Sequence, residues 1–211
     1  MKNKIFSEKE ISSENTEKLA YLSGFIVGDG NLGEGYIIRA VEENKDFIEN
    51  IFSETFNEVF GRKPKIYFDK YNNSFVAYVH CKNIWEFLAN EVGVETRTKS
   101  RTVKTPLLIA SGSQRLKIAF ISGIFDAEGS VILMKDSHHK NGYPRIQLKM
   151  CSSILVGEIS SMLRIFGIMN KEYKYSTFSM IQINGKKQCK NFNDIVGFKH
   201  PVKDEKLRAL L

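Results

Sequence analysis

The chain has 211 residues, a formal net charge of +7, a pI near 9.2 and 42% hydrophobic residues. This composition excludes an intrinsically disordered chain, and the length fits one large domain or two small ones. The longest nearly apolar stretch, Leu19 to Gly28, is far shorter than the roughly 20 residues of a membrane-spanning helix, so no membrane association is expected. Three widely spaced cysteines and the lack of a secretory signal favour the cytoplasm, or an organellar matrix for an organelle-encoded chain. The positive charge favours polyanionic partners such as nucleic acids.

An internal repeat is the main feature of the sequence. Leu19–Gly30 aligns with Ile118–Gly129, 99 positions later, and the two segments differ most where Val27 meets Asp126. A repeat of this kind decides the architecture of a chain. The sequence therefore predicts three parts: a first repeat over residues 1–98, a connector over 99–113 and a second repeat over 114–211.

Hydrophobic spacing and turn signals predict the same order of elements in both repeats: helix, two strands, helix, two strands, helix. In the first repeat we expect a helix over residues 14–28, a hairpin over 31–42, a helix over 45–60, strands over 65–69 and 74–81, and a helix over 83–90. In the second repeat we expect a helix from 114, strands over 130–134 and 143–150, a helix over 152–166, strands over 172–176 and 178–184, and a helix to about 196. The connection over 92–112 is expected to be extended.

Small residues mark one face of each repeated helix. Gly24 and Gly28 in the first copy, and Gly123 and Ala127 in the second, are four residues apart and therefore share a face. Small residues at this spacing let two helix backbones approach closely. We expect the two helices to pack against each other through these four positions.

Each repeated helix ends in an acid followed by glycine, at Asp29–Gly30 and Glu128–Gly129. A carboxylate is unfavourable at a helix C-terminus, which already carries partial negative charge. If the two helix ends lie together, their carboxylates and exposed carbonyl groups form a hard-oxygen site suited to Mg²⁺. The alternative, an acid tolerated at a wet surface, is the simpler explanation for one copy but a poor one for both.

The segments Leu22–Gly30 and Ile121–Gly129 resemble the paired motifs of the LAGLIDADG homing endonucleases, and the resemblance extends over about residues 14 to 205. The connector residues 99–106 and the ending 197–206 look like those of archaeal-type members. The resemblance implies a monomeric α+β fold with two pseudo-symmetric αββαββα repeats packed through the motif helices. The antiparallel sheets of such a fold form a saddle over the major groove of DNA.

The function that the resemblance implies is site-specific cleavage of double-stranded DNA. The reaction is metal-dependent phosphodiester hydrolysis with Mg²⁺, or another divalent cation such as Mn²⁺, and it gives a staggered cut at a long target site. By position, Asp29 and Glu128 are the catalytic metal ligands, and the backbone carbonyl groups of Gly28 and Ala127 are further ligands. No obligatory protein partner is implied.

Two other functions stay open or are disfavoured. A non-cleaving nucleic-acid binder, such as an intron RNA maturase on the same scaffold, is the alternative, although the loss of a motif acid that would mark it is not seen. An intein is disfavoured because the repeats use up the chain and no His-Asn pair ends it. A free-standing, intron-encoded endonuclease is the expected form.

Strand alternation selects the side chains that would reach the DNA. Arg145, Gln147 and Lys149 alternate with apolar residues in the clearest of the patterns, and such side chains pair with guanine or adenine in the major groove. A solvated strand face is the alternative for each residue. With the connector and the long second hairpin included, the expected DNA contacts are Arg39, Lys65, Tyr67, His80, Lys99, Arg101, Lys135, Lys140, Arg145, Gln147, Lys149, Lys174, Gln182 and Asn184.

Two positions depart from the family pattern. Relatives often carry Gln, Asn or Lys near the end of the second strand of each repeat, close to the scissile phosphate, but this chain has Glu42 and Met150. Lys149 and His80 are the candidates to replace them.

Overall fold

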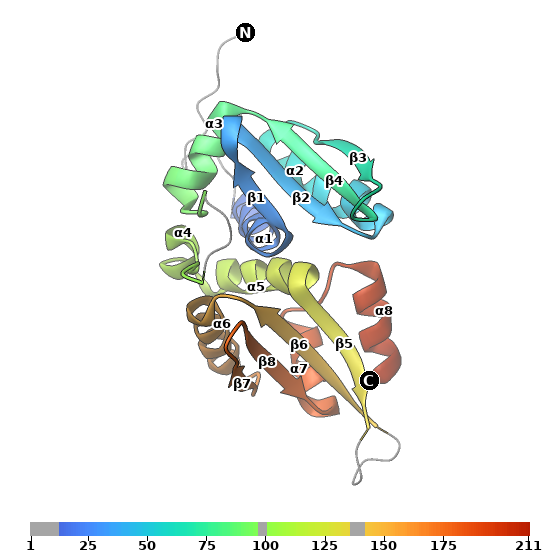
Figure 1. Cartoon of the computed structure of the whole chain (residues 1–211). Coiled ribbons are helices and arrows are strands. Elements are labelled where there is room, and N and C mark those ends of the chain that lie inside the picture. The colour runs from blue at the N-terminus through green and yellow to red at the C-terminus, as the bar shows by residue number, and fades with distance from the viewer. Residues whose placement is uncertain (1–12, 97–100, 136–141) are drawn as a thin grey trace. The chain divides into compact units, whose positions relative to one another are not determined.

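The computed structural model describes residues 13–96, 101–135 and 142–211, and it divides into two compact units, each built on one sheet (Figure 1). The first unit contains the described part of Met1–Thr98 together with Pro106–Ala127. The second contains the described part of Lys99–Thr105 together with Glu128–Leu211. The helix that opens the second sequence repeat is thus grouped with the first unit. The repeats over residues 1–98 and 114–211 and the connector over 99–113 therefore stay a prediction from the sequence.

The first unit consists of an antiparallel four-stranded sheet with strand order β1-β2-β4-β3 and the helices around it. Its elements are α1 (Ser13–Asp29), β1 (Gly30–Gly33), the 3₁₀ turn η2 (Glu34–Tyr36), β2 (Ile37–Glu42), the π-helical η3 (Phe47–Phe52), α2 (Ser53–Phe60), β3 (Lys65–Asp69), β4 (Ser74–His80), α3 (Lys82–Glu86), η4 (Phe87–Val92), α4 (Leu107–Ala110) and α5 (Gln114–Glu128, up to Ala127).

A row of phenylalanines fills the core of the first unit. Phe25 of α1 lies 5.1 Å from Phe47 and 5.4 Å from Phe52, measured between ring centroids, and Phe52 continues the row to Phe56 at 6.1 Å. These rings are fully buried because the apolar face of η3 and α2 packs between α1 and the sheet. Residues 19–28 of α1 are buried on all sides, which explains why this helix is apolar throughout rather than amphipathic.

The second unit repeats the same sheet, with strand order β5-β6-β8-β7. Its elements are β5 (Gly129–Met134), β6 (Tyr143–Met150), α6 (Ser153–Ile165), β7 (Lys171–Lys174), β8 (Ser179–Asn184), α7 (Lys186–Ile195) and α8 (Pro201–Leu210).

The connector is fastened to α6 of the second unit. The Thr105 backbone N–H and hydroxyl both donate to Glu158 Oε2 at 2.7 Å. The Ser152 hydroxyl, which caps α6, donates to the Val103 carbonyl at 2.6 Å. These bonds fix residues 103–105 on the helix side of the second sheet.

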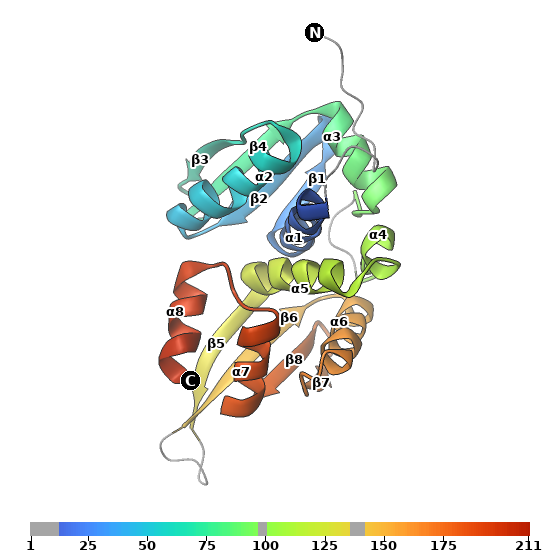
Figure 2. The same cartoon turned by 180° about the vertical axis from the view of Figure 1, so that it is seen from behind.

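Helices cover one face of each sheet. α1 and η3 contact β2 in the first unit, and α6, α7 and α8 contact the sheet of the second unit. Within the first unit, Figure 2 shows α2 in front of the strands. Within the second unit, it shows α6 and α7 in front of the strands. Among the described residues of each unit, the other face of the sheet has no helix packed on it, and we call this face the open face.

Two helices differ from the sequence expectation. The connection expected to be extended contains α4, and the chain after residue 196 forms α8, which was not predicted. His200 accepts a hydrogen bond from the Lys203 N–H at the start of α8, and Pro201 occupies its first turn. Among the described residues no helix combines the length and apolarity that crossing a membrane requires.

Candidate functional site

The backbones of α1 and α5 touch at two glycines. A Cβ atom on Gly24 would overlap the Phe120 carbonyl oxygen and lie 3.0 Å from the Ile124 nitrogen. A Cβ atom on Gly123 would overlap the Tyr21 carbonyl oxygen. Only glycine fits at these two positions, so the small residues let the helices cross in direct backbone contact. Gly28 and Ala127, one turn further along each helix, are buried as well.

A buried polar pair joins the same two helices. The Tyr21 hydroxyl donates to Asp126 Oδ2 at 2.7 Å, and neither side chain is exposed to solvent. Burial, and then the charge of the Asp126 carboxylate, raises the pKa of Tyr21 well above its usual value. Glu42 raises this pKa further. The Tyr21 hydroxyl therefore stays protonated and remains a hydrogen-bond donor to Asp126.

The two motif acids stand at the last position of each helix. Asp29 ends α1 and Glu128 ends α5, both are half-buried, and the next residue of each begins the first strand of a sheet. Gly30 makes this sharp change possible, because a Cβ atom there would overlap the Arg39 carbonyl oxygen. Carboxylate oxygens at helix ends are donors of the kind that Mg²⁺ and Ca²⁺ prefer. Within the described ranges no group of three or more His, Cys, Asp or Glu side chains is arranged to hold a metal.

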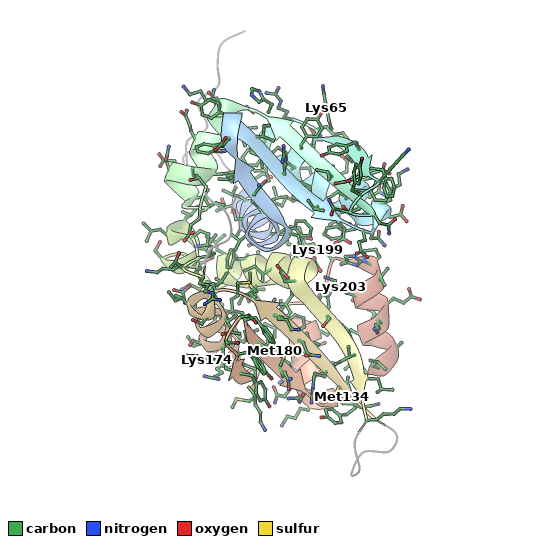
Figure 3. The ribbon with its side chains drawn as sticks, in the orientation of Figure 1. Lys65, Met134, Lys174, Met180, Lys199 and Lys203 are labelled. Atoms are coloured by element: carbon green, nitrogen blue, oxygen red, sulfur yellow. The ribbon has the colours of Figure 1, made fainter. Side chains whose placement is uncertain are left out.

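On the first sheet, strand register aligns a polar row across the open face. Asn31 of β1 pairs with Arg39 of β2, Arg39 pairs with Tyr78 of β4, and Tyr78 pairs with Lys65 of β3. Directly paired residues project from the same side of a sheet. Arg39 and Lys65 are exposed, and Figure 3 labels Lys65 at the outer edge of the sheet. Tyr67 lies on this face too, with its ring 5.8 Å from that of Tyr78.

On the second sheet, an equivalent row crosses the open face. Ser130 of β5 pairs with Gln147 of β6, Gln147 with Gln182 of β8, and Gln182 with Lys171 of β7. The alternation predicted for β6 is present, since Ile146, Leu148 and Met150 are buried while Lys149 is exposed.

Side chains around the second row are held by their neighbours. Arg145 donates from Nε to the Asn184 side-chain oxygen and from Nη2 to the Tyr143 hydroxyl, the latter at 2.8 Å. Lys149 Nζ lies 4.5 Å above the Phe178 ring. Such contacts fix a basic group before a ligand arrives and reduce the entropy lost on binding.

The remaining expected contacts fall at different places. His80 is exposed at the end of β4, Arg101 is exposed in the connector, and Lys135 is exposed after β5. Gln182 belongs to the polar row on the open face of the second sheet, but its neighbours bury most of its surface. Lys99 and Lys140 lie outside the described residues.

One expected contact lies on the other face. Lys174 pairs with Ser179, which pairs with Met150, so the register places Lys174 on the helix side of the sheet. Figure 3 labels it at the edge of the second sheet. The expected strand began at residue 172, whereas β7 begins at Lys171. Lys171 is the β7 lysine on the open face, and its place in the row matches that of Lys65. The expected placement of Lys174 on the open face is therefore wrong.

Glu42 and Met150 occupy matching places at the ends of β2 and β6, on the helix side. Glu42 is half-buried and accepts a hydrogen bond from the Asn44 N–H at 2.9 Å, while Met150 is buried. Neither side chain therefore belongs to an open row. The two candidates to replace them, Lys149 and His80, are exposed on the open faces.

The chain is similar in sequence to one protein family model and to several known proteins. Residues 115–197 match the family model described as a LAGLIDADG-like domain. The chain is 24% identical over 200 residues to the homing endonuclease I-ApeI of Aeropyrum pernix, which covers 92% of this chain and 86% of that protein. It is 26% identical over 203 residues to glutamine–fructose-6-phosphate aminotransferase of Methanocaldococcus jannaschii, but the match covers 93% of this chain and only 18% of that protein.

Solved structures confirm the expected α+β fold. The homing endonuclease I-WcaI bound to its DNA recognition sequence superposes with a TM-score of 0.64 at 17% identity, over 95% of this chain and 89% of that chain. I-DmoI in complex with DNA and Mn superposes with a TM-score of 0.61 at 19% identity, over 87% of this chain and 97% of that chain.

Proposed function

Because residues 115–197 match the LAGLIDADG-like domain model and the chain has the fold of LAGLIDADG homing endonucleases, we propose that it is a site-specific endonuclease that cuts double-stranded DNA. One observation supports this most strongly. The same junction occurs twice, with a half-buried acid ending a helix and the next residue beginning a sheet whose open face is lined by basic and amide side chains. A site-specific nuclease needs both parts, the acids to hold the cations that act on the phosphate backbone and the open faces to read the sequence.

We assign the chemistry to Asp29 and Glu128. Each carboxylate adds negative charge to a helix end that is already partly negative, so DNA phosphates approach these positions only with a cation present. The carboxylates, with the carbonyl groups of Gly28 and Ala127, would hold Mg²⁺ or Mn²⁺. A cation bound there supplies stabilisation of the charge that develops on the phosphate oxygens during hydrolysis. One acid in each repeat implies one cut in each strand, and we propose that the two cuts are staggered.

Sequence recognition belongs to the open faces in this proposal. Arg39, Lys65, Arg145, Lys149 and Lys171 would neutralise phosphates or pair with guanine, and the amides of Gln147, Gln182 and Asn184 would pair with adenine. I-WcaI and I-DmoI were solved on DNA, and one chain of each matches most of this chain, which supports a monomer acting on a duplex. A non-cleaving binder is not favoured, because both motif acids are present at their helix ends.

The test removes the carboxylates and keeps their shape. DNA from a randomised library that the wild-type protein retains in EDTA would be incubated with Mg²⁺ and each variant. Asp29→Asn and Glu128→Gln should bind this DNA as the wild type does, but their cleavage should fall at least a hundredfold. Glu205→Gln, an exposed position on α8, is the matched control and should cut normally. Full cleavage by the Asp29→Asn, Glu128→Gln double variant would refute the assignment.

A further inference from the structure

The crossing of α1 and α5 is almost two-fold symmetric in its backbone. The Cβ position of Gly24 lies 3.0 Å from the Phe120 carbonyl carbon and 3.0 Å from the Ile124 nitrogen. The Cβ position of Gly123 lies 3.0 Å from the Tyr21 carbonyl carbon and 2.9 Å from the Phe25 nitrogen. These contacts are equivalent under the repeat. A glycine crossing of this kind does not by itself distinguish α1 from α5.

The side chains break this symmetry. The repeat aligns Tyr21 with Phe120 and Val27 with Asp126. Tyr21 and Asp126 form the buried hydrogen bond between the helices, whereas Phe120 and Val27, at the equivalent positions, are buried and apolar. The crossing therefore contains one polar pair and one apolar pair at positions that the fold makes equivalent.

We propose that the Tyr21–Asp126 hydrogen bond selects the partner of each motif helix, so that α1 pairs with α5 and not with the same helix of a second copy of the chain. If two copies of α1 crossed at the same glycine, each Tyr21 would face Val27 of the other copy. If two copies of α5 crossed, each Asp126 would face Phe120 of the other copy. Both arrangements separate Tyr21 from Asp126 and lose the buried hydrogen bond between them.

The Tyr21–Asp126 hydrogen bond discriminates between partner helices and is not needed to attract them. Apolar side chains and glycines stabilise all three pairings alike, so they favour association without choosing a partner. A buried hydrogen bond that can form in only one pairing penalises the other two. The inference depends on the fold and not on the proposed nuclease activity, so it stands or fails independently of DNA cleavage.

The decisive experiment moves the pair to its equivalent position in the full-length chain. The exchanged variant carries Tyr21→Phe, Val27→Asp, Phe120→Tyr and Asp126→Val, which places the aspartate on α1 and the tyrosine on α5. We expect Tyr21→Phe and Asp126→Val alone to melt roughly 5–10 °C below the wild type, because each removes the buried hydrogen bond between the two helices. The exchanged variant should recover at least half of that loss.

A second measurement addresses the choice of partner directly. The double variant Tyr21→Phe, Asp126→Val has no polar pair, so pairing between copies is no longer penalised. After refolding from denaturant at high protein concentration, sedimentation equilibrium should show several-fold more dimer for this variant than for the wild type or the exchanged variant. The proposal is overturned if the double variant refolds with no more dimer than the wild type. It is also overturned if the exchanged variant melts as low as the single variants.

Discussion

Two cysteines of the second unit, Cys151 and Cys189, differ in their exposure to solvent. Cys189 is fully buried, and its Sγ donates to the carbonyl oxygens of Pro144 at 3.5 Å and Ile183 at 3.6 Å, whereas Cys151 is exposed. Burial raises the pKa of the Cys189 thiol to about 11. Because the folded-state pKa is raised, the neutral thiol stabilises the folded protein fully at every pH below the unfolded-state pKa. That contribution is lost as the pH rises through the interval up to about 11.

This difference predicts selective labelling of the native protein. The thiolate is the reactive form of cysteine, and the raised pKa leaves almost no Cys189 thiolate at pH 8. We expect iodoacetamide at pH 8 to modify Cys151 rapidly and Cys189 only after unfolding, with half-buried Cys81 between them. Mass spectrometry of peptides over a time course measures the three rates. Equal rates for Cys151 and Cys189 in native protein would contradict the burial of Cys189.

At the scale of single helices, replacing glycine should have opposite effects on stability in α5 and α6. Gly123 lies against the backbone of α1, whereas the nearest atom to a Cβ on Gly157 is Glu172 Oε2 at 3.8 Å. Gly157→Ala should stabilise the protein by about 0.5–1 kcal/mol through better helix propensity. Gly123→Ala or Gly24→Ala should destabilise it by about 1–3 kcal/mol or more, because the methyl group forces the helices apart. Thermal melting of the three variants measures both signs, and stabilisation by Gly123→Ala would show that the helices do not cross there.

Strong periodicity made several elements predictable from the sequence. The strands expected over 65–69 and 143–150 have the bounds of β3 and β6, because alternation of apolar and polar residues gives a clear period of two. α8 was missed although its signals are present, namely the His200 cap, Pro201 in the first turn and the Asp204–Arg208 pair. A strand start misplaced by one residue also assigned Lys174, rather than Lys171, to the open face.

The sequence predicted only those parts of the candidate site that occur in both repeats. The acids and the glycine strip were found because two copies of each stand at matching positions. The Tyr21–Asp126 pair breaks the repeat, and it could not be read from spacing because 105 residues separate its members. Its sequence signal was the mismatch of Val27 with Asp126, whose meaning becomes clear only when the helices cross.

At the scale of the whole molecule, a net charge of +7 supports general attraction to DNA. The polar rows place basic side chains on the open face of each sheet. A lysine that contacts phosphate strengthens binding to every sequence and steepens the dependence on salt. An amide that reads a base edge affects only the sequences that present that edge. The two roles can be separated experimentally because β7 carries two exposed lysines, Lys171 on the open face and Lys174 on the helix side.

Lys171→Gln should therefore weaken binding to all DNA sequences alike and lower the slope of log K against log salt by about one, whereas Lys174→Gln, its matched control, should change neither. Gln147→Ala, in the same row, should keep the salt slope and relax base preference over a small block of positions, at a cost of about 1–3 kcal/mol of discrimination. Titrations at several salt concentrations, combined with binding to a library of single-base variants, measure both effects. If Lys174→Gln lowered the slope and Lys171→Gln did not, DNA would bind the helix side of the second sheet, and the open face would not be the reading surface.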